Sequence, residues 1–368
     1  MKIKQKPSDF IVKENIDLEL NEKYTRSFTY SIYLMKKENL DTGNALKLLS
    51  RKLRVRGEEI KLSGLKDKLA ITSQYVSIKG KHPRNVVCKG LELVLKGYSQ
   101  FPLHIGMHKS NTFKVLISDL TPQQIKNIKL KKKMIIPNYF GDQRFGSVKF
   151  FNDSDDFIAK KILQRHYWEA LKIFLTKFTP DDEQKEIKKK IKQYWESLKD
   201  LNLSPGLYRT IVEVLAATNN PLQAMKKIPS RVLKLAIYAY QSYLWNETMK
   251  EYIKSNFEDY KTLKSVCGPL YFPNITKVED FKIPILNYKS KIPDEVKDAV
   301  DIVLNKEEFE QKDLRTKTFK DSFFSTSLRP AFVEAKNFSY RENKHGVVVE
   351  FTLPKGAYAT VVVDWLVL

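Results

Sequence analysis

The chain returns to a strand-like pattern at its end after a long helical stretch, and this return constrains the fold more than any other feature. Residues 28–34, 74–78 and 112–117 show strand-like alternation or β-rich content. Residues 346–353 and 359–368 read as two further strands around a Pro-Lys-Gly turn. Because late strands can pair only where earlier strands lie, the simplest topology is a sheet domain interrupted by a helical block.

The interrupting block has apolar residues at helical spacing from Phe157 onward, with Pro-containing breaks between successive helices. The expected helices are residues 154–177, 182–199, 205–217 and 230–255. The sequence therefore predicts an α+β fold with two domains. A mixed, mostly antiparallel sheet domain is expected from residues 1–150 plus about 326–368, and a mainly helical insertion domain from residues about 151–325.

The chain is strongly basic, with 65 Lys plus Arg against 43 Asp plus Glu and a formal net charge of +22. This surplus indicates a polyanionic partner such as nucleic acid, although an anionic membrane surface fits the charge equally well. No stretch approaches the ~18–20 uninterrupted apolar residues of a bilayer span, and the first residues lack the apolar core of a signal peptide. Cys88 and Cys267 are too few for a disulfide framework. We therefore expect an intracellular, cytoplasmic protein.

Asp67 stands between two lysines shortly before a predicted strand. Gly64 provides a bend that permits close approach, and apolar Leu69 and Ile71 are expected to draw the neighbourhood of Asp67 toward the core. In an extended stretch the two flanking lysines project away from the carboxylate, so its counterion must come from elsewhere. Taken alone, a Lys-Asp-Lys sequence is more often an exposed turn than a catalytic site.

Residues 137–146 concentrate aromatic, amide, guanidinium and glycine groups in one short segment. Aromatic faces stack on unpaired bases, Asn and Gln read base edges, and Arg binds phosphate or a carboxylate. The structural alternative is a loop that fills its own core with Tyr139, Phe140 and Phe145. The polar side chains beside these aromatics favour contact with RNA.

Signatures of several other chemistries are missing from the sequence. There is no GxxxxGK[ST], GxGxxG, HExxH or GxSxG motif, so neither a nucleotide cofactor nor a metal is expected. His104 and His108 lie in a segment without helical pattern, which favours two separate polar residues over a metal pair. The acidic cluster Asp153, Asp155 and Asp156 could bind Mg²⁺ in a nuclease, but a helix N-terminal cap explains it better.

Five motifs in a fixed order resemble the TruD family of transfer-RNA pseudouridine synthases. The nucleophile motif Gly-x-Lys-Asp-(Lys/Arg)-x-Ala-x-Thr-x-Gln is met by residues 64–74, and Asn-Tyr-Phe-Gly-(Glu/Asp)-Gln-Arg-Phe-Gly is met without a gap by residues 138–146. The likeness spans nearly the whole chain, with a loose match over about 255–325. The five motifs correspond to residues 4–14, 64–74, 138–146, 241–246 and 353–360.

This resemblance implies a pseudouridine synthase-like sheet domain with a TruD-type insertion, in an enzyme that needs no cofactor. The implied reaction isomerises uridine to pseudouridine in tRNA, first expected at uridine 13 of the D-arm. Asp67 is then the ionised catalytic carboxylate, and Lys4 is the candidate cation that keeps it charged. Base-edge contacts then distinguish uracil, and the lysine-rich surface supplies affinity for tRNA through phosphate contacts. The protein is expected to act as a monomer.

Further residues receive substrate-binding roles through the same resemblance. Phe140 is the first choice for stacking on the extruded base and Tyr358 the second. Asn138 is expected to hydrogen-bond the uracil edge or to position Asp67, while Gln143 and Arg144 are partners that could also be structural. The main alternative is a non-catalytic RNA-binding or RNA-remodelling protein on the same scaffold.

Overall fold

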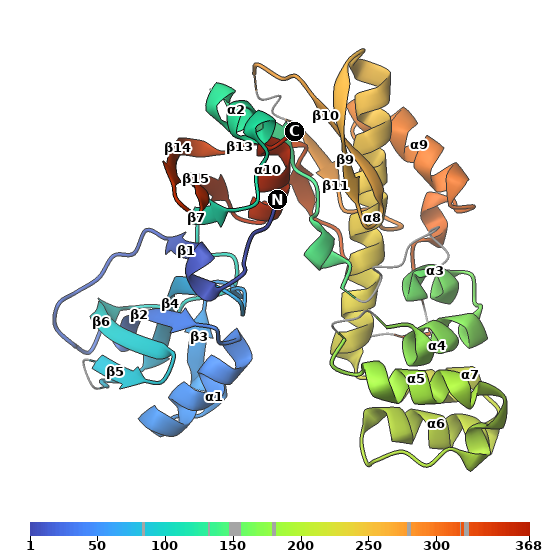
Figure 1. Ribbon diagram of the computed structural model, residues 1–368. Helices are drawn as coiled ribbons and strands as arrows, with labels where there is room; N and C mark the ends of the chain where they lie inside the picture. The colour runs from blue at the N-terminus through green and yellow to red at the C-terminus, as the bar shows by residue number, and fades with distance from the viewer. Residues whose placement is uncertain are drawn as a thin grey trace. The chain divides into compact units, whose positions relative to one another are not determined.

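The computed structural model describes residues 1–82, 85–131, 133–146, 156–178, 182–277, 281–316, 318–319 and 324–368. The chain divides into two compact units (Figure 1). Unit 1 comprises Met1–Ile135 and Val333–Leu368, and unit 2 comprises Ile136–Phe332. Helices and a mixed, mostly antiparallel sheet occur together, which confirms the predicted α+β class. The division into a catalytic and an insertion domain stays a prediction.

Unit 1 is built on a sheet whose nine described strands run in the order β14-β15-β7-β1-β4-β2-β6-β5, with β3 paired to β4. The pair β1 and β4 is parallel, and the other pairs along this path are antiparallel. The strands are β1 (Phe10–Asn15), β2 (Tyr30–Glu38), β3 (Ile60–Leu62), β4 (Ile71–Lys79), β5 (Asn85–Cys88), β6 (Leu91–Ser99), β7 (Ser110–Ile117), β14 (Lys336–Asn343) and β15 (Gly346–Pro354).

Strand β15 returns to the sheet formed by the first part of the chain, as the sequence predicts. It pairs with β7 in a register that places Phe351 opposite Phe113. The two rings stack with centroids 5.7 Å apart, and Phe10 of β1 meets Phe113 edge-on at 6.0 Å. Aromatic packing across three strands therefore joins the two ends of the chain in one core.

The segment after β15 corrects one prediction. Residues 359–368 are predicted as a strand, but α10 (Ala359–Leu366) is a helix. Strand β15 already has β14 on one side and β7 on the other, so its edges offer no place for another strand. Six residues of α10 are buried, among them Val361, Val362 and Val363, and burial on this scale outweighs the strand propensity of a valine run.

Short helices complete unit 1. Helix α1 begins after Asp41, whose carboxylate accepts a hydrogen bond from the Asn44 backbone N–H at 2.9 Å. Ala45 and Leu49 lie on its buried face, in one cluster with β2, β4 and β6 residues. The helices of unit 1 are η1 (Pro7–Asp9), α1 (Thr42–Leu53), η2 (Gly57–Glu59), α2 (Pro122–Leu130) and α10.

Unit 2 is mainly helical, and its longest helix is α8 (Ser230–Asn256). The predicted helix over 154–177 is two helices instead, separated at Arg165, which has a left-handed φ of 62°. A core of apolar residues fills the space among α3 to α7. The other helices are η3 (Asp142–Arg144), α3 (Ile158–Leu163), α4 (Tyr167–Thr176), α5 (Lys185–Gln193), η5 (Trp195–Asp200), α6 (Leu207–Thr218), α7 (Pro221–Met225), η6 (Asp294–Val296), α9 (Lys297–Lys306) and η7 (Gln311–Asp313).

Three two-stranded sheets occur besides the nine-stranded sheet in the described parts of the chain, and the sequence pattern does not anticipate them. β9 pairs with β10, β11 with β12, and β8 with β13. Over the parts of the chain that the structure describes, no helix has both the length and the apolar content to cross a membrane. The strands are β8 (Ile135–Pro137), β9 (Tyr260–Ser265), β10 (Gly268–Pro273), β11 (Lys282–Pro284), β12 (Leu328–Pro330) and β13 (Phe332–Glu334).

Candidate active site

Asp67 lies in the loop that joins β3 to β4, and several backbone hydrogen bonds fix this loop. The Gly106 N–H donates to the Ser63 carbonyl at 2.7 Å, and the Gln74 side-chain amide donates to the Gly64 carbonyl at 2.9 Å. A Cβ on Gly64 would lie only 3.1 Å from the His108 ring, so the absence of a side chain permits this approach. The carboxylate therefore projects from a well-supported backbone.

The counterion of Asp67 is Lys4, the cation that the family resemblance implies, and it comes from outside the loop, as the direction of the flanking lysines predicts. The Lys4 Nζ lies 2.6 Å from Asp67 Oδ2, and the side chains are 19% and 35% exposed respectively. The same ammonium sits 4.0 Å from the centroid of the Phe10 ring. The pair is thus partly desolvated, and the Asp67 side chain keeps about a third of its surface exposed.

Lys66 is bound elsewhere, although it adjoins Asp67 in sequence. Its Nζ lies 2.8 Å from Glu14 Oε2, and the two side chains are 6% and 0% exposed. The second oxygen of Glu14 accepts a hydrogen bond from the Tyr75 backbone N–H at 3.1 Å. This buried ion pair anchors the loop to β1 and β4 without neutralising Asp67.

Lys37 is a feature of the site that the sequence interpretation missed. It is 1% exposed, and its Nζ donates to the carbonyl oxygens of Asp67 at 2.6 Å, Leu40 at 2.7 Å and Lys66 at 3.3 Å. Burial lowers the pKa of the Lys37 ammonium, and the negative charge of Asp67 opposes that shift. The alternation Tyr33, Met35, Lys37 along β2 is the signal that could have placed this lysine on the buried face.

One expectation about the loop is wrong. Leu69 was expected to draw the neighbourhood of Asp67 inward, but its side chain is 41% exposed. Ala70 is fully buried instead, and the chain enters the sheet only there. Tyr358, the second residue proposed to stack on a base, is half-buried immediately before α10.

The second motif lies in unit 2 and is largely buried. Asn138 is 4% exposed and Phe140 7% exposed. The Asn138 side-chain amide donates to the Pro330 carbonyl at 3.0 Å and its oxygen accepts from Arg329 at 2.8 Å. The Arg329 guanidinium also lies 4.0 Å from the centroid of the Phe140 ring. Arg329, which sequence reasoning missed, therefore supports both residues at once.

Helix α8 holds the backbone of this segment through the third motif. The Asn246 side-chain oxygen accepts from the Phe140 N–H at 2.9 Å, and its amide donates to the Phe140 carbonyl at 3.0 Å. The Arg144 Nε donates to Ser242 Oγ at 3.0 Å, whereas Gln143 is exposed. Asn246 and Ser242 of the 241–246 motif thus support this segment. Among the predicted residues, Lys4, Asp67 and Tyr358 thus belong to unit 1, and the others to unit 2.

The described residues contain no group of three His, Cys, Asp or Glu side chains that could hold a metal ion. Of the acidic cluster considered for Mg²⁺, Asp153 and Asp155 lie outside the described residues, and Asp156 pairs with Lys177 at 3.0 Å. Cys88 and Cys267 are free thiols.

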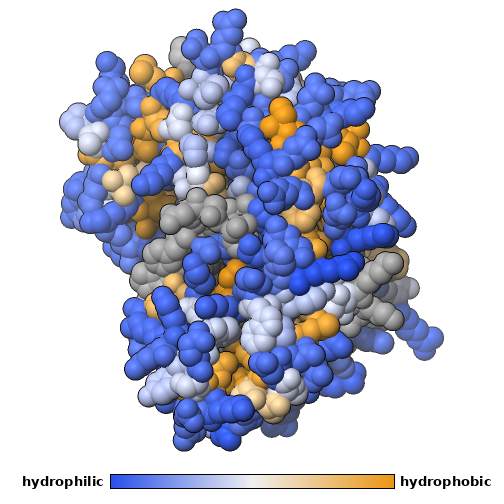
Figure 2. Space-filling view, turned by 90° about the vertical axis from the view of Figure 1, so that its right-hand side faces the viewer, coloured by the Kyte–Doolittle hydropathy of each residue, from blue (hydrophilic) through white to orange (hydrophobic). Residues whose placement is uncertain are grey.

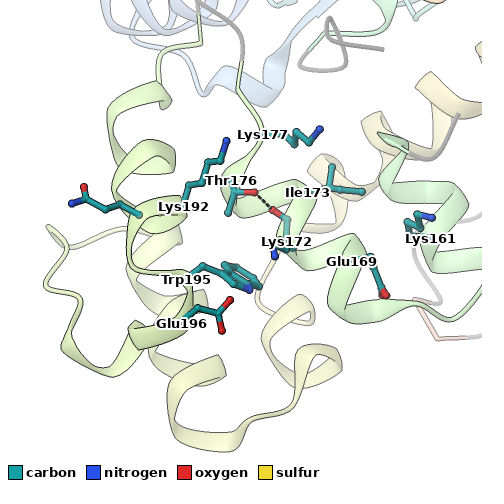
Figure 3. Close-up of a pocket in the computed structure, with 10 residues that line it drawn as sticks. Lys161, Glu169, Lys172, Ile173, Thr176, Lys177, Lys192, Trp195 and Glu196 are labelled. Atoms are coloured by element: carbon teal, nitrogen blue, oxygen red, sulfur yellow. Dashed lines mark hydrogen bonds between the residues drawn. The ribbon is translucent and has the colours of Figure 1, made fainter. Parts of the chain in front are cut away.

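Unit 2 also has a pocket of about 510 Å³ that is separate from all of the predicted site residues (Figure 3). Side chains of α4 face those of α5 and Trp195 across it, and lysines reach its rim. The lining consists of Lys161, Glu169, Lys172, Ile173, Thr176, Lys177, Lys192, Gln193, Trp195 and Glu196. Because it contains both basic and acidic side chains, the pocket by itself does not select a ligand.

Over almost its whole length the chain is similar to proteins of one family. The profile of the family described as tRNA pseudouridine synthase D (TruD) matches residues 1–265 and 277–364. A Nanoarchaeum equitans protein named "Probable tRNA pseudouridine synthase D" is 31% identical over 391 residues, covering 100% of this chain and 99% of that relative. The tRNA pseudouridine synthase D of Aquifex aeolicus is 30% identical over 381 residues, with 98% and 96% covered.

The fold has a solved counterpart. A crystal structure of a TruD protein from Methanosarcina mazei superposes with a TM-score of 0.73 at 23% identity, covering 100% of this chain and 93% of that one. The fold and the family match together define the class of the protein, an isomerase of the pseudouridine synthase type. Within this class, the chain belongs to the TruD family of tRNA pseudouridine synthases.

Proposed function

We propose that this protein converts uridine 13 in the D-arm of tRNA to pseudouridine, with Asp67 as the catalytic carboxylate. The observation that carries the proposal is the ion pair between Lys4 and Asp67, whose Nζ and Oδ2 atoms lie 2.6 Å apart. The two residues stand in different TruD motifs of the sequence, and the family match covers both. The names of the relatives, tRNA pseudouridine synthases, support tRNA as the substrate class. The monomeric state and the cytoplasmic location stay predictions.

The reaction breaks the C1′–N1 bond, turns the uracil and rejoins it through C5, with no net redox change. It needs a group that can add to the sugar or base, or abstract a ribose proton, and an ionised carboxylate can do either. Lys4 pairs with the Asp67 carboxylate, and a nearby cation stabilises negative charge on a partly desolvated group. The Lys37 ammonium on the backbone of the same residue acts in the same direction.

Recognition of the extruded base is proposed for aromatic and amide side chains. Phe140 remains the first candidate for stacking and Tyr358 the second. For Asn138, the bonds to Arg329 and Pro330 favour a role in holding the segment over direct reading of the base edge. Arg144, bonded to Ser242, is likewise assigned to support, and Gln143 is left as an exposed candidate for RNA contact.

The proposal is tested with Asp67→Asn and a matched control, Asp119→Asn. Asp119 forms a comparable pair with Lys2 at 2.7 Å in the same unit, but both side chains are more than half exposed. We expect Asp67→Asn to slow conversion of a tRNA transcript by at least about 10³-fold, because the reacting group is lost. Asp119→Asn should convert at the wild-type rate. Pseudouridine is mapped by carbodiimide modification and primer extension.

Each part of the proposal fails on a different result. Conversion that persists in Asp67→Asn removes Asp67 from the chemistry. Conversion of a transcript with cytidine at position 13 assigns the target to another uridine. Tight tRNA binding by the wild-type protein without any change in nucleosides would favour the non-catalytic RNA-binding alternative.

A further inference from the structure

Two large apolar side chains stand in open solvent beside the Asp67 loop. Leu65, two residues before the carboxylate, is 77% exposed. Ile105 is 70% exposed, and it precedes Gly106, whose N–H donates to Ser63 at 2.7 Å. A single exposed Leu or Ile is ordinary. Two on hydrogen-bonded loops next to the proposed catalytic group call for a physical role.

The backbones beneath these two side chains are fixed. The buried Gly64 packs against His108, and the His108 ring nitrogen Nδ1 lies 3.2 Å from the Ser63 carbonyl. On the other loop, the Lys355 Nζ donates to the Gly106 carbonyl at 2.7 Å. Both apolar side chains therefore lie on loops that are already ordered, so binding a partner costs little additional conformational entropy.

The surroundings of these two side chains are basic. Lys68 and Lys355 are both exposed; Lys68 lies on the Asp67 loop, and Lys355 lies on the turn after β15, from which it reaches the loop of Ile105. Apolar side chains surrounded by lysines complement RNA, because the apolar groups can pack on base faces while the lysines bind phosphates. The surface of a partner protein does not offer stacked apolar faces and anionic groups side by side in this regular way.

We propose that Leu65 and Ile105 form an apolar wedge that enters the base stack of the RNA at the place left by the target uridine. Extrusion of a base costs a few kcal/mol of stacking and pairing, and an inserted apolar side chain recovers part of that contact. The wedge thus stabilises the extruded state that Asp67 requires. This inference rests on the proposed function, because it presumes a uridine drawn out of folded RNA.

The test compares Leu65→Ala and Ile105→Ala with Val87→Ala. Val87 is equally exposed, at 75%, but lies on the edge strand β5, which β2 and β6 separate from β4 in the sheet order. We expect kcat/KM on folded tRNA to fall about tenfold for each wedge variant, as the loss of one buried apolar contact predicts, and to stay unchanged for Val87→Ala. Leu65→Met, which keeps the apolar bulk, should restore the rate.

A second substrate separates a wedge from a general binding contact. In a transcript whose target uridine has lost its pairing partner, extrusion is cheap, so Leu65→Ala should convert it at close to the wild-type rate. In the Asp67→Asn background, 2-aminopurine next to the target should brighten on binding, and less so when Leu65→Ala is added.

Two results would overturn the wedge. One is conversion of folded tRNA by Leu65→Ala and Ile105→Ala at the rate of Val87→Ala. The other is an equal loss on folded and unpaired substrates, which would assign these residues to binding in general. A wild-type protein that converts no uridine at all would instead overturn the proposed function, and the two failures are therefore distinguishable.

Discussion

Lys37 is an ammonium group held inside the protein by carbonyl oxygens. Its three acceptors are the carbonyls of Leu40, Lys66 and Asp67, and two of these belong to the Asp67 loop. Such a group does two things at once. It fixes the backbone from which the carboxylate projects, and it places positive charge beneath that carboxylate, where low dielectric strengthens the effect.

Substitution of Lys37 is predicted to damage both folding and catalysis. Lys37→Met leaves buried carbonyl oxygens without a donor, and this should lower the free energy of unfolding by roughly 2–4 kcal/mol. It should also lower the single-turnover rate with little change in KM for tRNA. Urea denaturation and single-turnover kinetics measure the two effects.

The neighbouring Lys36 supplies the control, because it lies on the same strand with its side chain exposed. Lys36→Met should leave stability within about 0.5 kcal/mol of wild type, as surface substitutions usually do. Equal behaviour of the two variants would contradict the role assigned to Lys37.

At the scale of single residues, the sequence indicates the charged residues that stand in motifs, but it does not indicate the residues that hold them in place. Asp67 and Lys4 stand in motifs, and strand geometry predicts that the flanking lysines point away. Lys37 and Arg329 carry no such mark. The partners of Lys37 are backbone carbonyls, which every residue has, and Arg329 meets Asn138 across a separation of 191 residues. Only the folded chain shows these contacts.

Helices and strands were predicted correctly where the periodicity of apolar residues in the sequence agrees with the burial of these residues in the fold. The alternation of β2 and β7 and the apolar spacing of α6 and α8 identify these elements correctly. In α10 the valine run indicates a strand, but the occupied edges of β15 exclude one. The break between α3 and α4 at Arg165 has no proline or glycine to announce it.

The helical state of α10 can be tested with two prolines. Asp364→Pro lies in the helix interior and removes a backbone donor, so we expect it to destabilise the protein by about 3 kcal/mol. Thr360→Pro lies in the first turn, where the N–H has no intrahelical acceptor, and should cost far less. Urea denaturation of both variants gives the difference. Equal costs would contradict a helix at these positions.

The whole molecule carries its charge on a surface that is mostly hydrophilic. In Figure 2 hydrophilic side chains cover most of the visible face, and the apolar ones gather in small separate patches. The formal net charge of +22 is far above the handful that solubility alone requires. Such a surface attracts a polyanion through counterion release, which depends on salt but not on base sequence.

Binding of tRNA is therefore predicted to weaken steeply with salt. If the protein neutralises about 6–10 phosphates, affinity should fall about 10³- to 10⁵-fold between about 50 and 200 mM salt. Filter binding of Asp67→Asn to labelled tRNA measures the slope without turnover. A change of less than about tenfold would mean that phosphate contacts contribute little.

The place of β15 in the sheet has a consequence for synthesis. Its neighbour β7 is made early, whereas β15 and β14 emerge last, after all of unit 2. Until then, β7 is an edge strand, and its unpaired backbone N–H and C=O groups can pair with a strand of another chain. A chain that terminates after Phe332 but before Gly346 should thus have a complete unit 2 and an unfinished, aggregation-prone sheet, which makes it a substrate for chaperones and proteases.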